Sequence, residues 1–203
     1  MPSAADIEQK AIDAAMTIAA ERPWDSITLR DIAAAAGLSL AQLYPVLSSK
    51  PAILDAYMRQ VDVDMLTTLE EFDGQESSRD RLFDVIMQRL DTLERHRAGV
   101  RSVFRALSSN LTMLPALHDP MLRSMGVILA GAALDSSGFR GGFRRRLMGI
   151  VWLTTLRVWL EDDMSDLAKT MAHLDRQLRR IEEISQGFCG RVNDRAFPSA
   201  ARI

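Results

Sequence analysis

The sequence predicts an all-α protein with a small N-terminal domain and a larger C-terminal one. Proline and glycine are scarce, at 7 and 11 of 203 residues, and valine and isoleucine are sparse beside alanine, leucine and methionine. No run shows the sustained alternation of apolar and polar residues that marks a half-buried strand. A hydrophobic content of 47% in a chain of this length is enough to bury a sizeable core.

The N-terminal domain, residues 1–50, should open with a helix over residues 4–21, because its apolar residues recur on one face. Two short helices should follow, over residues 28–35 and 40–44. Thr28 stands three residues before an aspartate, which is close to a capping box. Ser39 stands three residues before a glutamine, which is a true capping box.

Gly37 and Pro45 limit the two short helices. Gly37 stands where the first must end and the chain must turn, a place that favours a residue without a side chain. Pro45 cannot donate a helix-interior hydrogen bond and disfavours helical geometry at Tyr44, so the second helix should be short or distorted. Two short capped helices hinged on a glycine are the layout of a helix-turn-helix DNA reader.

Residues 26–55 resemble the N-terminal signature of the TetR/AcrR family of bacterial transcriptional regulators. The positions that agree in residue type and spacing are Thr28, Ile32, Ala33, Ala36, Gly37, Leu38, Ser39, Leu43, Tyr44, Ser49, Lys50 and either Ile53 or Leu54. Pro45 and Leu47 depart from the signature, which more often has a polar or aromatic residue and a phenylalanine there. Leu40 and Ala41 replace the usual polar or basic pair.

The resemblance implies a TetR-like fold and binding to double-stranded operator DNA. It implies phosphate contacts from Thr28, Tyr44 and Lys50, and base contacts from Ser39, Leu40, Ala41 and Gln42. Leu40 and Ala41 are apolar and can contact only thymine methyl groups, which favours an A·T-leaning site. Gln42 could bond adenine through both amide atoms, or could serve solely as the capping partner of Ser39; the sequence leaves both readings open.

Charge gives little support for DNA binding. The formal net charge is −2, and residues 1–60 carry five basic and seven acidic side chains. DNA-binding domains usually gain non-specific affinity from a basic face. This domain would have to rely on a few well-placed groups.

The C-terminal domain, residues 51–190, should be helical and should follow on a linking helix. The expected helices cover residues 51–72, 79–95, 98–108, 117–134, 143–161 and 166–187, with a loop at 74–78. Residues 191–203 are polar, include a proline and should form a flexible tail.

Two functions are expected of the C-terminal domain: it should bind a small apolar effector and form a homodimer. Candidates that line the pocket are Met65, Met87, Phe104, Met113, Met121, Met125 and Trp152, although such residues at helical spacing are more often plain core. Candidates for the dimer interface are Phe143, Leu147, Ile150, Thr154 and Val158 on one helix, and Leu174, Leu178 and Ile181 on the next. An ordinary monomeric bundle core is the alternative.

Other chemistry is weakly indicated. His96, His118 and His173 lack the spacing of a metal site, and no catalytic pair stands out, so we expect no metal, no cofactor and no enzyme. Residues 138–142 and the three arginines after them could hold a phosphate or an anionic lipid head, or be a solvated loop. A single cysteine and the lack of a long apolar run predict a cytoplasmic protein without a membrane span.

A second function competes with the regulator. The run from residue 151 to residue 176 also resembles lipid-binding accessory proteins of ubiquinone biosynthesis, which share the TetR architecture but are not repressors. The intact helix-turn-helix pattern favours DNA binding. The acidic N-terminal domain and Pro45 favour the lipid-binding reading.

Overall fold

A computed structural model describes residues 2–69 and 75–196, and every regular element in those residues is helical. This confirms the predicted all-α class. The α-helices are α1 Ala4–Glu21, α2 Leu29–Ala35, α3 Leu40–Leu43, α4 Lys50–Thr68, α5 Ser78–Glu94, α6 Arg97–Ser109, α7 Leu114–Gly131, α8 Gly138–Glu161 and α9 Ala168–Ala196. Two short 3₁₀ helices, η1 Trp24–Ser26 and η2 Leu111–Met113, complete the order.

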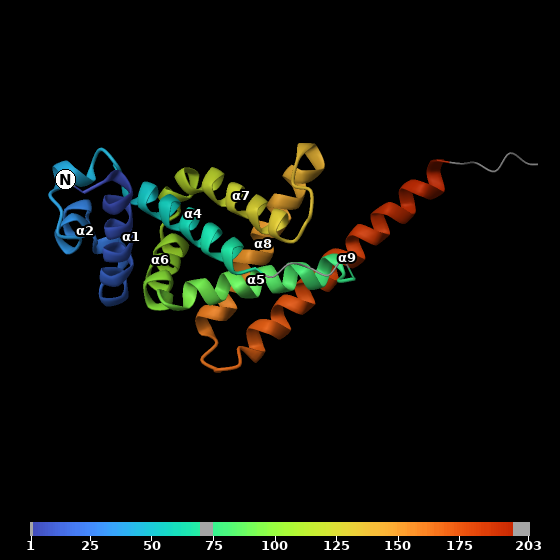
Figure 1. Cartoon of the computed structure of the whole chain (residues 1–203). Coiled ribbons are helices and arrows are strands. Elements are labelled where there is room, and N and C mark those ends of the chain that lie inside the picture. Colours follow the sequence, from blue (N-terminus) through green and yellow to red (C-terminus); the bar gives the residue numbers. More distant parts are fainter. Residues whose placement is uncertain (1, 70–74, 197–203) are drawn as a thin grey trace, which may run out of the picture.

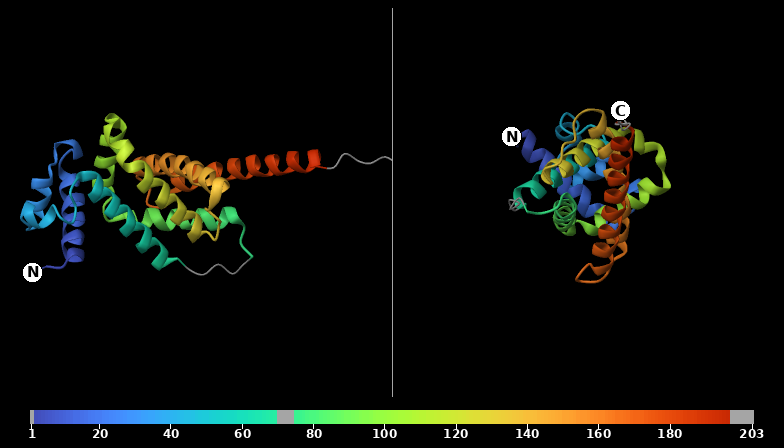
Figure 2. Two further views of the ribbon diagram at one scale, coloured as in Figure 1. Left: turned by 90° about the horizontal axis from the view of Figure 1, so that it is seen from above. Right: turned by 90° about the vertical axis from the view of Figure 1, so that its right-hand side faces the viewer.

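The helices form a headpiece and a body that meet along α1. Helices α1, α2 and α3 make the headpiece at one end, and α4 runs from it into the body, where α5 to α9 gather (Figure 1). Helix α6 packs beside α1. Seen from above, α9 extends beyond the body on the side away from the headpiece (Figure 2). The headpiece therefore rests on α6 and α4 of the body.

Local side-chain caps define the helices of the headpiece. Thr28 Oγ1 accepts a hydrogen bond from the Asp31 amide at 3.2 Å, and an Asp31 carboxylate oxygen accepts one from the Thr28 amide at 2.8 Å. This is a complete capping box, where the sequence indicated only an approximate one. Ser3 with Asp6 makes the same motif before α1, and Ser49 caps α4. These bonds lower the pKa of Asp31.

A buried ion pair links four helices of the body. Arg89 of α5 donates to Asp62 of α4 and, at 2.8 Å, to Ser124 of α7. Ser124 in turn donates to Asp62 at 2.8 Å, and the guanidinium lies 4.8 Å from the ring centroid of Trp152 in α8. Arg89 is 2% exposed. The cation is thus paired, hydrogen-bonded and covered by an aromatic face, as a buried charge requires.

Some helix ends differ from those predicted. Helix α8 begins at Gly138, five residues before residue 143, because Gly138 adopts a φ of +62° and Gly141 lies against the Ser136 backbone with no room for a Cβ. Helix α9 continues to Ala196 instead of ending near residue 187, so residues 191–196 of the predicted flexible tail are helical. Residues 197–203 of that tail lie outside the described residues, as does residue 74 of the predicted loop at 74–78. The rest of that loop, residues 75–77, is irregular, and residue 78 already begins α5.

The contact between headpiece and body depends on Gly99. A Cβ at this position of α6 would lie 2.5 Å from the Met16 carbonyl oxygen of α1. Backbone cannot retreat from such an overlap without moving a helix. A larger residue would therefore push α1 away from α6.

We expect Gly99→Ala to lower the thermal unfolding midpoint, by an amount equivalent to about 1–3 kcal/mol, because the added methyl overpacks the contact. The matched control is Gly149→Ala in α8. That methyl would find its nearest neighbour, Met125, at 3.9 Å, so it should be neutral or stabilising through helix propensity. Equal midpoints for the two variants would contradict the tight α1–α6 contact.

Candidate DNA-binding and ligand-binding sites

The helix-turn-helix has the geometry that the sequence predicts. Helix α2 ends at a turn where Gly37 takes a φ of +66°, and Ser39 then caps α3. Leu38 and Leu43 are buried and hold the two helices together. The predicted contact residues Thr28, Ser39, Leu40, Ala41, Gln42 and Tyr44 are all exposed. The reading surface is therefore open, although α3 has only four residues.

Pro45 ends α3 without breaking the turn. Tyr44 keeps helical geometry, with φ −56° and ψ −39°, contrary to the expectation for a residue before proline. The amide of Leu47 still bonds to the Leu43 carbonyl at 2.9 Å, so the chain passes over Pro45 in one compact turn. The ring of Tyr44 is left 59% exposed at the end of this turn.

The side chain of Gln42 is engaged in the cap of α3. Its Oε1 accepts hydrogen bonds from the Ser39 amide and the Ser39 hydroxyl, both at 2.9 Å. Reading adenine through both amide atoms needs that same oxygen as an acceptor. Of the two roles that the sequence left open for Gln42, the structure supports capping, and a two-bond contact with adenine would require the cap to open.

Lys50 is partly committed to the headpiece. Its Nζ donates to the carbonyl oxygens of Trp24 at 2.6 Å and Ile27 at 2.9 Å, and lies 4.8 Å from the Trp24 ring centroid. Burial lowers the pKa of Lys50, and nearby Asp25 opposes that shift. An ammonium has three N–H groups, so one remains for a phosphate. The main structural role of Lys50 is to tie the start of α4 to the turn before α2.

Arg30 is a candidate that the sequence reasoning missed. It lies exposed on α2, and no carboxylate pairs with it in the described part of the chain. By contrast, Arg22 lies 3.8 Å from Asp31, and Arg59 pairs with Asp55 at 2.5 Å. The sequence signal for Arg30 was its position one residue after the start of α2.

An apolar cavity of about 530 Å³ lies in the body. Helices α1, α4, α5, α6, α7 and α8 contribute to its lining, which includes Met16, Tyr57, Arg89, Val103, Phe104, Leu107, Met121, Trp152 and Leu156. Arg89 is neutralised by Asp62, so the cavity offers no free cation at that point. One donor is left over: the buried Nε of Arg89 has no hydrogen-bond partner in the described residues.

The predicted pocket residues divide into three groups. Phe104, Met121 and Trp152 line the apolar cavity. Met65 and Met125 are fully buried in the core, and Met113 packs against the core without lining the cavity, so these three correct the prediction. Methionine at helical spacing does not distinguish cavity from core. Met87 lines a different cavity.

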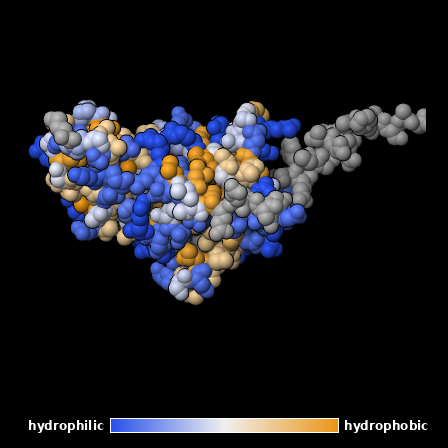
Figure 3. Space-filling model, in the orientation of Figure 1, coloured by the Kyte–Doolittle hydropathy of each residue, from blue (hydrophilic) through white to orange (hydrophobic). Residues whose placement is uncertain are grey.

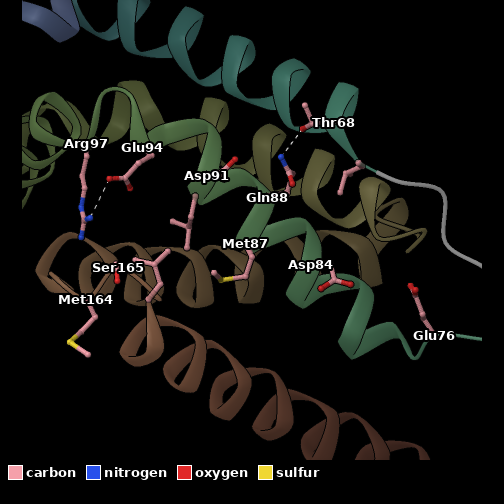
Figure 4. A pocket seen from close by; sticks show the side chains of 13 residues that line it. Thr68, Glu76, Asp84, Met87, Gln88, Asp91, Glu94, Arg97, Met164 and Ser165 are labelled. Carbon is pink, nitrogen blue, oxygen red and sulfur yellow. Dashed lines mark hydrogen bonds and ion pairs between the residues drawn. The ribbon is translucent and has the colours of Figure 1, made fainter.

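That second cavity, of about 740 Å³, lies between α5 and the α8–α9 connection (Figure 4). Its rim carries the carboxylates Glu76, Asp84, Asp91 and Glu94. Desolvation and the neighbouring Asp80 raise the pKa of Asp84. Apolar residues also line this cavity, namely Leu69, Met87, Leu90, Met164 and Leu167, but the four carboxylates do not suit a purely apolar effector.

The predicted dimer face is partly exposed. On α8, Phe143 and Ile150 are 63% and 61% exposed, while Leu147, Thr154 and Val158 are half-buried. On α9, Leu174 and Leu178 are buried within the chain and Ile181 packs against the core, because α9 lays this seam on α5 and α8. Leu174 and Leu178 are therefore already covered, and the free part of the face belongs to α8.

Other chemical signals are accounted for by structure. Within residues 2–69 and 75–196, no group of three potential ligands could hold a metal, and no helix is long and apolar enough to cross a membrane. Asp162 is buried and accepts hydrogen bonds from the Thr170 amide at 2.9 Å and hydroxyl at 2.8 Å. Burial raises its pKa, but these bonds outweigh burial and hold it below the usual value. Asp162 thus caps the first turn of α9.

Comparisons with known proteins agree with this architecture. Residues 11–57 match the sequence model of the family described as bacterial regulatory proteins, tetR family. A comparison with curated protein sequences gave no match. Solved structures match over most of both chains, at identities that establish the fold alone.

Three of these structures illustrate the likeness. A TetR transcriptional regulator from Nitrosomonas europaea is 23% identical, with a TM-score of 0.63, covering 85% of this chain and 96% of that one. One from Rhodococcus sp. RHA1 is 20% identical, with a TM-score of 0.65 and coverages of 86% and 94%. One from Streptomyces coelicolor is 19% identical, with a TM-score of 0.59 and coverages of 93% and 85%. Residues 11–57 are therefore a domain of the tetR family of bacterial regulatory proteins, and the chain as a whole has the TetR fold.

Proposed function

We propose that this protein is a dimeric, ligand-responsive transcriptional regulator of the cytoplasm, acting as a repressor that binds operator DNA. The observation that carries the proposal is the helix-turn-helix itself, complete in its caps and its left-handed Gly37 and lying within the segment that matches the tetR family. The exposed residues of α3 are accessible to a major groove of DNA.

DNA would be held by positioning contacts more than by reading contacts. Thr28 and Tyr44 are exposed, so the Tyr44 hydroxyl and the amides that begin α2 can approach phosphates, whereas the Thr28 hydroxyl already donates to the Asp31 carboxylate at 2.8 Å. Arg30 on the same helix adds a cation that no carboxylate of residues 2–69 or 75–196 pairs with. Leu40 and Ala41 can contact thymine methyl groups, while Gln42 stays in its cap. The proposed site is consequently A·T-leaning, with modest sequence discrimination.

An apolar ligand in the 530 Å³ cavity would act on the headpiece through Met16. Met16 lines the cavity, and its backbone carbonyl oxygen is the atom against which Gly99 packs. A ligand that displaces Met16 would therefore shift α1 relative to α6. In a dimer, such a shift changes the separation of the two recognition helices, which couples ligand binding to DNA binding.

We expect Ala41→Glu to weaken DNA binding while leaving the fold intact. The residue is exposed, and a carboxylate in the first turn of α3 suits the helix dipole but repels the phosphates. Fluorescence anisotropy with the protein's own upstream DNA, at several salt concentrations, should show at least about a tenfold loss of affinity, in line with the loss of about 1.4 kcal/mol.

The control for that experiment is Val63→Glu, which adds the same charge at an exposed site of α4. It should bind as the wild type does. Absence of wild-type binding even at low salt would refute the regulator, whereas equal losses in both variants would move the DNA contact away from α3.

We expect Val103→Phe to reduce binding of Nile red, a neutral apolar probe, because the larger ring fills part of the cavity that Val103 lines. Tryptophan fluorescence should report the same change, since Trp152 lines the cavity. Val63→Phe, on the exposed side of α4, should bind the probe normally. Unchanged binding in Val103→Phe would place the probe elsewhere.

We expect Ile150→Glu to convert the dimer to monomers in sedimentation-velocity experiments, because a charge at the centre of the free α8 face opposes its burial. Val63→Glu is again a close control, since Val63 and Ile150 are each 61% exposed. A wild-type protein that sediments as a monomer would contradict the proposed dimer. A dimer that survives in Ile150→Glu would place the interface off this face.

A lipid-binding accessory protein without DNA binding is the second candidate. It is favoured by the almost wholly apolar cavity and by the commitment of Gln42 and Lys50 to the headpiece. Under this proposal, the wild type would show no salt-dependent DNA binding and would retain lipid detectable by native mass spectrometry. The anisotropy experiment separates the two candidates.

A further inference from the structure

The start of α8 carries an unusual set of side chains, defined here as the arginine–phenylalanine tip: Phe139, Arg140, Phe143, Arg144, Arg145 and Arg146. It projects from the body, and hydrophobic and strongly hydrophilic surfaces lie side by side on it (Figures 1 and 3). Phe139 is 95% exposed and Phe143 is 63% exposed, more than any other large hydrophobic side chain described. Exposing aromatic rings to water is unfavourable, so they call for a partner.

The arginines of the tip lack carboxylate partners. Among the described residues, none of the four forms an ion pair with an aspartate or glutamate. Arg144 donates to the Asp135 carbonyl oxygen at 2.9 Å, and Arg146 donates to the Gly142 carbonyl oxygen at 3.3 Å. The carboxylate of Asp135 is already engaged by the amide and hydroxyl of Ser137. The Ser137 hydrogen bonds and, to a smaller extent, nearby Arg144 lower the pKa of Asp135, so this one carboxylate offsets part of the charge of Arg144. Most of the positive charge of the tip has no such partner among the described residues.

The spacing places the rings and the charges where a single flat surface could meet both. Phe139 and Phe143 are four residues apart and so share one face of the helix. At 100° per residue, Arg146 lies on this face about 40° from its centre, and Arg140 lies about 80° to the other side, whereas Arg144 and Arg145 point about 120° and 140° away from it. Long arginine side chains beside an apolar stripe can extend to a polar layer while the rings enter an apolar one.

The tip lies at the end of the body remote from the headpiece in both orientations (Figures 1 and 2). DNA bound along α3 therefore does not reach it on the same protomer. A second copy is a poor match for the four arginines, since a two-fold interface at this point would bring patches of like charge together. Phe143 also belongs to the predicted dimer face, but Phe139 and Arg140 lie beyond that face.

We propose that the arginine–phenylalanine tip docks on the surface of a membrane rich in anionic lipids. Arg140 and Arg146 bind lipid phosphates, and the Phe139 ring enters the boundary between headgroups and acyl chains, as in amphipathic helices that lie at the interface, while Phe143 is left to the predicted dimer face. The contact is peripheral. It is independent of the cavity and of DNA binding, so it applies under either function proposed above.

Sedimentation of the full-length protein with vesicles tests this proposal. The wild type should bind vesicles of equal parts phosphatidylglycerol and phosphatidylcholine, should bind pure phosphatidylcholine vesicles far less, and should be released by salt. Arg140→Gln/Arg146→Gln should weaken binding about 25-fold, at about fivefold for each arginine lost. Phe139→Ala should weaken it several-fold.

Arg105→Gln/Arg157→Gln removes the same charge from exposed sites outside the tip and outside the proposed DNA-binding residues, and should keep vesicle binding. Failure of the wild type to bind anionic vesicles at low salt would overturn the proposal, as would an equal loss in this control pair. Sedimentation velocity without vesicles supplies the last arm. If Phe139→Ala dissociates a dimer and leaves vesicle binding unchanged, the tip contacts a second copy instead.

Discussion

The body is organised around one buried cation. Arg89 brings a full positive charge into an apolar core, and leaving such a charge unpaired costs about 3–5 kcal/mol. Asp62, Ser124 and the Trp152 ring satisfy it, and they come from three different helices. The register of α4, α5, α7 and α8 is therefore fixed by chemistry rather than by shape alone. Arg89 and Trp152 also line the apolar cavity, so the same interactions fix the position of its walls.

The helical architecture could be read from the sequence because its signals are local. Caps at Thr28 and Ser39, the turn at Gly37 and a three-to-four residue apolar period each act within one or two turns. The boundaries that differ depend on longer-range contact. The early start of α8 depends on the approach of Gly141 to the Ser136 backbone, which no periodicity reveals.

The candidate sites could be predicted less fully. Exposure of the recognition residues follows from the motif, yet the engagement of Lys50 with the Trp24 carbonyl joins residues far apart in sequence. For the pocket, residue type identified Phe104 and Trp152 but also selected Met65 and Met125, which are core. Arg89 was missed because a charged residue gives no sequence signal of burial. On α9, the apolar seam predicted contact with a second copy, but the seam packs against α5 and α8 of the same chain.

The capping boxes of the headpiece also bear on how the molecule folds. Each is a bond between residues three apart, whereas the links of Arg89 and Ser124 join residues 27 to 62 positions apart. Closing short loops loses little chain entropy, and folding rates rise as contacts become more local. The headpiece helices should thus form early and supply α1 as a preformed surface. The body would then assemble on that surface, with the closure of its buried ion pair as the slower event.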